Sequence, residues 1–309
     1  MKLTVRNYKT DSDYQGIREF LHHVFVLNDY WEHSWQVMRF DYWRWHGILN
    51  MGDGQLETDV FIWETPKGDI AAVLNREAPG SCWLQVHPDY RTRELEEQMI
   101  SVAAKHLTVP TADSNQRHHI WTEPSDDLRL EILKRHGYTK SKRNECQRRR
   151  CMSVPIPEFP IADGYTVRAL GDTDELPARS WVSWRAFHPN EPDEAYQGWQ
   201  WYHNIQKAPL YRRDLDIVAV APGGKLAAFC TVWFDDVSNT GVFEPVGTDP
   251  DHQRRGLASA VMTEGLRRLR RLDAKYAYVG SWNEATHTLY GDKMGFKDYV
   301  ALEAWEKVV

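Results

Sequence analysis

The sequence predicts an α/β protein, layered in the α+β manner, with two tandem domains that each hold a mixed β-sheet flanked by helices. In both halves of the 309 residues, apolar runs of strand character alternate with segments of helical periodicity. This order places helices on both faces of a sheet. The second half also repeats the order of elements in the first, which predicts two copies of one domain.

The repeat is clearest at a strand–turn–helix junction that occurs once in each half. Val86 to Leu95 aligns with Thr248 to Leu257 at a constant offset of 162 residues, with Pro88 on Pro250. Each junction is followed by an apolar helix, a strand that contains Trp, and a short helix ending at Gly and an aromatic residue. A period of this length excludes a solenoid.

A proline-rich segment over 154–162 predicts a stiff linker between the copies. We therefore expect domains over 1–153 and 163–309, each of ordinary size. Each copy should begin with a strand and two helices. The helices are predicted over 11–25 and 34–49 in the first copy, and over 174–188 and 194–208 in the second.

Composition and charge exclude several classes of protein. A net charge of −6 argues against a general nucleic-acid binder. No apolar run approaches the roughly 20 residues that cross a membrane, and the N-terminus lacks the apolar core of a signal peptide. The four cysteines form no Cys-x-x-Cys pair and the paired histidines lack partners at metal spacing. We therefore expect reduced thiols, a cytoplasmic location and no metal, while the oligomeric state stays open.

A run of arginines over Arg148, Arg149 and Arg150 falls in a predicted late strand. Charged side chains commonly protect the exposed edge of a sheet from pairing with other chains. We therefore expect this run to protect an edge.

The strongest functional signal is the second strand–turn–helix junction. An apolar strand over 241–247 runs into a polar turn, and a long apolar-periodic helix begins after Gly256. The first N–H groups of a helix have no partner within it, and the helix dipole adds positive potential. Gly256 removes the side chain that would keep a phosphate away, while Arg254 and Arg255 add charge. The junction therefore predicts a diphosphate site.

These residues resemble the GNAT superfamily of N-acetyltransferases, which grips the diphosphate of coenzyme A with Gln/Arg-x-x-Gly-x-Gly/Ala at this junction. Gln253, Gly256 and Ala258 fill that pattern. A second match is Asn283 followed by Tyr290 and a Gly-Phe pair, with one residue more than usual after the tyrosine. One extra residue would rotate Tyr290 by about 100° in a regular helix. The resemblance covers nearly the whole chain as a tandem protein.

The resemblance implies acetyl-CoA as cosubstrate and assigns residues to it. Pro245 cannot donate to the strand ladder, so the sheet should loosen at 246–248 and free backbone groups for the pantetheine arm. Asn283 would hold the arm from the opposite side. The predicted cofactor-binding residues are Val246, Thr248, Gln253, Arg254, Arg255, Gly256, Leu257, Ala258 and Asn283.

Glu244 and Tyr290 are the predicted catalytic residues. A charge in an apolar central strand is unusual unless it faces a cleft, and GNAT enzymes often take a general base from this strand, directly or through water. Glu244 has the alternative role of a structural carboxylate bonded to a helix end. Tyr290 would donate to the departing thiolate, with a packing role as its alternative. An N–H near Val246 would stabilise the oxyanion.

The predicted reaction is direct acetyl transfer to an amine within a ternary complex. The acceptor is a small-molecule amine or an amino group of a peptide or protein. Its site would lie between the first two helices of the second domain and the cofactor strand, lined by some of the aromatic residues Trp181, Trp184, Phe187, Trp199, Trp201 and Tyr202. Asp235 and Asp236, and the acidic residues over 191–194, would instead attract a cationic acceptor. A non-catalytic acyl-CoA-binding or regulatory module also fits the sequence.

The first copy differs where the chemistry would occur. Glu94 stands at the position of Gly256, and Ile132 and Leu133 occupy the positions comparable to Tyr290. A carboxylate at the point where a diphosphate would lie opposes binding by charge and by bulk. We expect a degenerate copy that has lost its cofactor, with binding of something else in the vacated cleft as the alternative.

Overall fold

The computed structural model describes residues 2–112 and 115–308. The chain folds into two compact units: unit 1 holds residues 1–146 and 300–309, and unit 2 holds residues 147–299. This division exchanges segments between the repeats, because the end of the first repeat belongs to unit 2 and the end of the chain belongs to unit 1. The domain boundaries that we expect from the sequence, 1–153 and 163–309, follow the repeats and remain a prediction.

Unit 1 contains a mixed sheet in the strand order β1-β2-β3-β4-β6-β13, with β5 beside β6. Its strands are β1 (Thr4–Asn7), β2 (Val60–Glu64), β3 (Ile70–Ala78), β4 (Ser81–Val86), β5 (Val109–Pro110), β6 (Gln116–Thr122) and β13 (Asp298–Val308). Its helices are α1 (Asp11–Leu27), α2 (Val37–Tyr42), α3 (Leu56–Asp59), α4 (Arg93–His106) and α5 (Asp127–Arg135). The β4–β6 pair is parallel, and the other pairs in this order are antiparallel.

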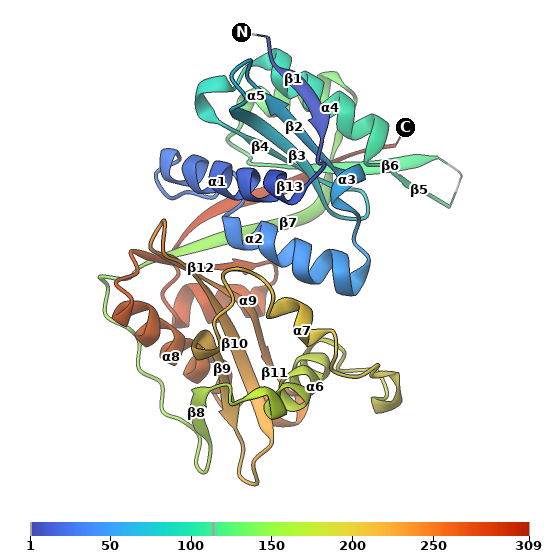
Figure 1. Ribbon diagram of the computed structural model, residues 1–309. Coiled ribbons are helices and arrows are strands. Elements are labelled where there is room, and N and C mark those ends of the chain that lie inside the picture. Colours follow the sequence, from blue (N-terminus) through green and yellow to red (C-terminus); the bar gives the residue numbers. More distant parts are fainter. Residues whose placement is uncertain (1, 113–114, 309) are drawn as a thin grey trace. The chain divides into compact units, whose positions relative to one another are not determined.

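The sheet of unit 1 is covered on both faces, as its ribbon shows (Figure 1). On one face, α4 and α5 pack against side chains that include Leu74 and Leu84. On the other face, α1 and α2 pack against the alternate side chains, among them Ile62 and Val73. The alternation of side chains along each strand therefore builds two apolar layers around one sheet.

Unit 2 repeats this arrangement with the order β7-β12-β11-β10-β9-β8. Its strands are residues 147–151 of β7 (Thr139–Cys151), β8 (Thr166–Ala169), β9 (Asp216–Val220), β10 (Leu226–Asp235), β11 (Thr240–Thr248) and β12 (Tyr276–Ser281). Its helices are α6 (Leu176–Phe187), α7 (Tyr202–Ile205), α8 (Leu257–Arg271) and α9 (Glu284–His287), the last continued by a π-helical turn over Thr288–Lys293.

Two helices hold the sheet of unit 2 between them. The apolar stripe of α8 packs on the face that carries Cys230, Val232 and Phe243. Helix α6 packs on β10 and β11, where the Arg179 guanidinium lies 3.9 Å from the centre of the Phe229 ring. Because Phe229 and Cys230 are neighbours in β10, they point to opposite faces, and the two helices cover opposite sides.

The prediction of a second helix is partly wrong in both copies. In unit 1 the helical run is present, but α2 passes into a π-helix over Trp43–Met51. In unit 2 the segment 194–208 holds only a short 3₁₀ turn over Asp193–Ala195 and the four-residue helix α7. Gly198 has φ of +97°, a left-handed conformation that ends regular helix, so the aromatic spacing there is not helical.

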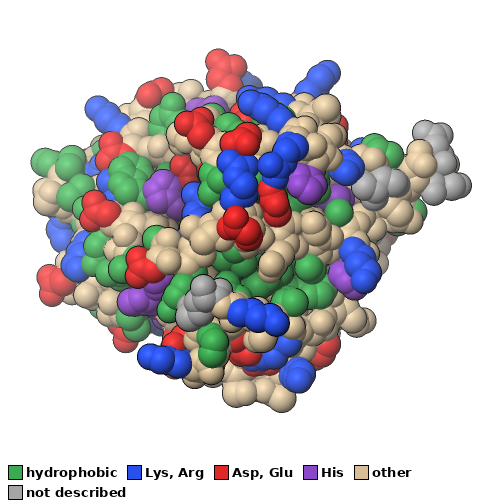
Figure 2. Space-filling view, turned by 90° about the horizontal axis from the view of Figure 1, so that it is seen from above, with side chains coloured by type: hydrophobic (Ala, Val, Ile, Leu, Met, Phe, Trp, Pro, Cys, Tyr) green, Lys and Arg blue, Asp and Glu red, His purple; other side chains and the backbone are tan. Residues whose placement is uncertain are grey.

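Basic and acidic side chains are interspersed on the face shown in Figure 2, without a continuous basic area among the described residues. Within residues 2–112 and 115–308, no helix is long and apolar enough to cross a membrane. Across the same residues, no group of three or more His, Cys, Asp or Glu side chains is placed to hold a metal ion.

Candidate functional site

Helix α8 begins with its backbone N–H groups uncovered. Gly256, the residue before the helix, has φ of 73° and ψ of 8°, and Arg254 has φ of 59°. The first backbone bond of the helix runs from the Ala260 N–H to the Gly256 carbonyl at 3.0 Å. No side chain caps the helix, and its first three N–H groups make no hydrogen bond within the described chain. Left-handed residues and free N–H groups together form a concave anion site.

The space above these N–H groups is open. A Cβ atom on Gly256 would meet no protein atom within 4 Å. At Gly265, by contrast, a Cβ atom would lie 2.5 Å from the Phe243 ring, so that glycine is required by internal packing. Gly256 therefore serves the left-handed turn and leaves room for a ligand. The side chains of Gln253, Arg254 and Arg255 are exposed around this opening.

Strand β11 leaves its neighbour before it reaches the turn. It pairs with β12 only from Thr240 to Val242, whereas its pairing with β10 continues to Thr248. A bulge places Glu244 and Pro245 opposite the single residue Thr231 of β10. The ladder between β11 and β12 therefore ends at Val242, six residues before the end of β11. The separation of strands expected at Pro245 is present, and it begins two residues earlier, at Phe243.

Tyr290 lies close enough to Glu244 for the two side chains to interact electrostatically. The Tyr290 side chain is 5% exposed, and its hydroxyl makes no hydrogen bond within the described chain. Burial raises the pKa of Tyr290, and the negative charge of Glu244 raises it further. The hydroxyl is therefore protonated at neutral pH and can donate a hydrogen bond to a ligand atom near Glu244.

The extra residue between Tyr290 and the Gly-Phe pair is absorbed by the π-helical turn. The Phe296 N–H donates to the Tyr290 carbonyl and the Met294 N–H to the Leu289 carbonyl, both at 2.9 Å. A π-helical turn accommodates one additional residue without rotating the residues before it. The predicted rotation of Tyr290 by the extra residue is therefore not imposed by the backbone.

Arg148 and Arg150 hold this turn, and the prediction that they protect a sheet edge is wrong. Arg148 donates to the Ser281 hydroxyl at 2.8 Å and to the Phe296 carbonyl at 3.2 Å. Arg150 is 3% exposed and donates to the Met294 carbonyl at 3.1 Å. Sequence reasoning missed this role because the arginines precede the turn by more than 130 residues. The charge run carried no sign of its partners.

Asn283 is the N-cap of α9. Its Oδ1 accepts a hydrogen bond from the Thr286 N–H at 2.9 Å, and the Asn283 N–H donates to the Thr286 hydroxyl at 3.2 Å. This reciprocal cap fixes the Asn283 side chain just beyond the end of β12. Its contact with the pantetheine arm stays a prediction.

Comparisons with known proteins agree with this geometry. A model of the Acetyltransferase (GNAT) family matches residues 176–296, which include α6, the α8 start and Tyr290. The mycothiol acetyltransferase of Salinispora tropica is 26% identical over 271 residues, covering 83% of this chain and 84% of the relative. The mycothiol acetyltransferase of Salinispora arenicola is 27% identical over 228 residues, covering 71% and 70%.

Solved structures match the chain over its full length. A GCN5-related N-acetyltransferase from Sphaerobacter thermophilus has a TM-score of 0.67 at 16% identity, covering 99% of this chain and 95% of its own. A tandem GNAT protein from the clavulanic acid biosynthesis pathway has a TM-score of 0.64 at 12% identity, covering 99% and 98%. Residues 176–296 are a GNAT acetyltransferase domain, and the whole chain has the fold of a tandem GNAT protein. The predicted two-copy α/β fold is confirmed.

The corresponding helix start in unit 1 of this GNAT protein is capped. The Thr92 hydroxyl accepts a hydrogen bond from the Leu95 N–H at 3.2 Å. Glu94 accepts from its own N–H and from the Thr92 hydroxyl, and these bonds lower the pKa of its carboxyl. The N–H groups of Glu94 and Leu95 at the start of α4 thus have side-chain partners, whereas no side chain caps α8.

A buried ion quartet, formed by Arg91, Glu96, Asp126 and Arg129, joins α4 to α5 in unit 1. The inaccessible Glu96 side chain accepts from Arg91 and from Arg129 at 2.8 Å, and Asp126 accepts from Arg91 at 2.6 Å. Burial alone would raise the pKa of both carboxyls, but the charges of Arg129 and Arg91 outweigh it and lower both.

Unit 2 carries uncharged residues at the four positions of the ion quartet. The repeat offset places Gln253 and Ala258 at two of them, and Asn283 matches Asp126 because both residues cap the next helix. Thr286 follows Asn283 at the spacing at which Arg129 follows Asp126. In unit 1, charged side chains therefore occupy the region between the starts of α4 and α5, whereas unit 2 has uncharged side chains at the matching positions.

Two of the aromatic side chains predicted beside the acceptor, Trp184 and Tyr202, are part of the core, whereas Trp181, Trp199 and Trp201 are half-buried. Trp184 is 9% exposed and stacks on Trp181 at 5.4 Å, while Tyr202 is 1% exposed and donates its hydroxyl to the buried Asp216. Phe187 differs, because half of its surface is accessible. Phe187 is thus the member of this group best placed to meet a ligand.

Proposed function

We propose that unit 2 transfers the acetyl group of acetyl-CoA directly to an amine within a ternary complex. The observation that carries this proposal is the uncapped start of α8 beside two left-handed residues. Such a site suits the diphosphate of coenzyme A, because free N–H groups, the helix dipole and nearby arginines all attract an anion. The side chains of Gln253, Arg254 and Arg255 would border it.

The end of β11 beyond its ladder with β12 would receive the pantetheine arm. When bound, acetyl-CoA supplies a thioester carbonyl that is open to attack. The Val246 N–H would donate to that carbonyl oxygen and stabilise the negative charge that develops on it. Thr248 would continue the backbone contacts, and Asn283 would border the arm across the opening.

Glu244 and Tyr290 would manage the protons of the reaction. An amine at neutral pH is mostly ammonium and has no lone pair for attack, so Glu244, directly or through a water, would accept a proton from it. The new bond joins the amine nitrogen to the acetyl carbon, and the bond from that carbon to sulfur breaks. Tyr290 would donate a hydrogen bond to the departing thiolate.

A small-molecule amine is the acceptor class best supported. Relatives aligned over most of this chain are named mycothiol acetyltransferases, which makes the amine precursor of mycothiol the first acceptor to assay. At 26% to 27% identity, acceptor preference can differ between relatives, so other small amines belong in the same panel.

Titration calorimetry with coenzyme A tests the cofactor site. We expect a stoichiometry of about one per chain, and a loss of at least about 100-fold in affinity in Gly256→Glu. Gly223→Glu is the matched control, because Gly223 also has a left-handed φ of +96° and no atom within 4 Å of a Cβ. Two sites per chain, or binding that survives Gly256→Glu, would overturn the assignment to unit 2. Binding without turnover of any amine would indicate a non-catalytic acyl-CoA-binding module.

A further inference from the structure

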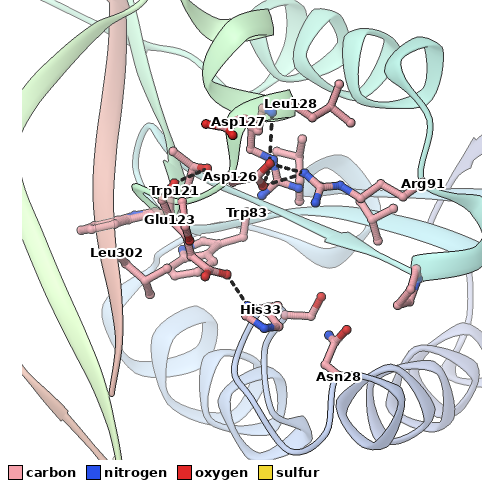
Figure 3. A pocket seen from close by; sticks show the side chains of 17 residues that line it. Asn28, His33, Trp83, Arg91, Trp121, Glu123, Asp126, Asp127, Leu128 and Leu302 are labelled. Carbon is pink, nitrogen blue, oxygen red and sulfur yellow. Dashed lines mark hydrogen bonds and ion pairs between the residues drawn. The ribbon is translucent and has the colours of Figure 1, made fainter. Parts of the chain in front are cut away.

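Unit 1 keeps an open cleft although its helix start is capped. Strands β4 and β6 pair only through Ser81 with His119 and Cys82 with Ile120, and then separate. A cavity of about 450 Å³ opens beside the separated strand ends, bordered also by α5 and by the segment after α1 (Figure 3). This volume lies in the range of small-molecule sites.

Two indole rings form the apolar wall of this cavity. Trp83 and Trp121 stack with ring centres 5.6 Å apart and an angle of 18° between planes. The Trp121 Nε1–H donates to the Ser81 hydroxyl at 3.0 Å, and the Trp83 Nε1–H donates to Glu77 at 2.8 Å. Both N–H groups are already bonded, and Trp83 is also covered by the Arg39 guanidinium 4.3 Å from its ring centre, so the rings offer a ligand their edges and the π surface of Trp121. Trp121 is the more exposed of the two.

The charge left in the cavity is negative. Arg91 and Arg129 line it, but the ion quartet balances these two cations with the carboxylates of Glu96 and Asp126. Glu123 and Asp127 also line the cavity and lie outside the quartet. His33 contacts one oxygen of Glu123 across the opening, as Figure 3 shows. Two carboxylates beside an indole wall suit a cation.

We propose that the cleft of unit 1 binds a small organic cation, an ammonium attached to an apolar or aromatic body. The ammonium lies against Glu123 and Asp127, and the body lies against Trp121. A diphosphate ligand is disfavoured, because Thr92 and Glu94 occupy the N–H groups it would need. This site belongs to unit 1 and is separate from the proposed acetyl-CoA site.

Three probes of one size test the proposal on the full-length protein: benzylamine, benzyl alcohol and benzoate. They share a ring and differ in charge at neutral pH. Saturation-transfer NMR should show saturable binding of benzylamine, at least about 10-fold tighter than that of benzyl alcohol and with benzoate weakest. Saturating coenzyme A should leave benzylamine binding unchanged, because it occupies unit 2.

The double variant Glu123→Gln with Asp127→Asn keeps both side-chain shapes and removes both charges. Benzylamine affinity should fall at least about 10-fold while the thermal midpoint stays within a few degrees. Glu131→Gln is the control, since this exposed carboxylate of α5 does not line the cavity. Equal binding of the three probes, displacement by coenzyme A, or unchanged affinity in the double variant would overturn the proposal. A double variant that is unfolded leaves the probe series as the deciding measurement.

Discussion

Helices α4 and α8 follow matching junctions in the two units, but a side chain caps α4, whereas α8 leaves its first three N–H groups without partners in the described chain. In α4, Thr92 and Glu94 satisfy the helix start and Glu96 anchors it through the ion quartet. In α8, glycine and alanine occupy the positions of the two glutamates.

The difference shows how one scaffold serves two purposes. At a capped and ion-paired helix start, side chains of the protein itself accept hydrogen bonds from the backbone N–H groups. At an uncapped start these N–H groups can donate to a ligand. Unit 2 therefore gives up contacts that unit 1 retains, which is the pattern expected where a binding site departs from the most stable local structure.

We expect the largest effect, a loss of folding or of coenzyme A binding, when the chain is cut after residues 147–151 of β7 rather than before them. A fragment over 160–309 lacks residues 147–151 of β7, together with the Arg148 and Arg150 bonds to the π-helical turn. We expect it to be unfolded or unable to bind coenzyme A, whereas a fragment over 147–309 should bind better. Circular dichroism and calorimetry on both fragments make the comparison. Equal behaviour would show that the exchanged strand is dispensable.

Breaking the ion quartet should destabilise unit 1. Glu96→Gln leaves Arg91 and Arg129 facing a neutral group in a buried site, which typically costs about 3–5 kcal/mol. Glu131→Gln, which removes an exposed pair with Arg93, should cost about 1 kcal/mol or less. Urea unfolding of the two variants measures both values. A Glu96→Gln protein as stable as the control would contradict a structural role for the quartet.

Tyr290→Phe should affect turnover and leave binding intact. The substitution keeps the buried ring and removes the hydroxyl, so we expect coenzyme A affinity to change little. Turnover should fall by about 10²-fold or less, since thiolate is a moderate leaving group and proton assistance typically contributes about 10²–10⁴. Steady-state kinetics with an accepted amine measures the loss. Unchanged turnover would assign Tyr290 to packing.

A smaller effect is expected from pH on the stability of unit 1. The pKa values of Glu96 and Asp126 are lowered in the folded state, so their stabilisation is fully present above the pKa values of the unfolded chain. It is lost as pH falls through the folded pKa values. Unfolding of the wild type should therefore show a steeper loss of stability below about pH 4 than that of Glu96→Gln. Parallel curves would contradict this linkage.

The sequence predicted the parts of the fold that local pattern and repetition determine. Strand periodicity and the offset between Pro88 and Pro250 were sufficient for two α/β copies, and Gly256 marked the open helix start. The positions of Arg148 and Arg150 depend on contacts with residues far along the chain, which local charge cannot reveal. The π-helical turn at Tyr290 was visible only as one surplus residue, because spacing does not say how a helix accommodates an insertion.

The exchange of strands also bears on synthesis. Strand β6 finds its antiparallel partner in residues 303–308 of β13, which are synthesised long after β6. Until then, that edge of β6 carries unpaired N–H and C=O groups that can join other chains. The first repeat therefore keeps an open edge until β13 has been synthesised, and unit 1 can be completed only after the second repeat has been made, although domains commonly fold in sequence during synthesis.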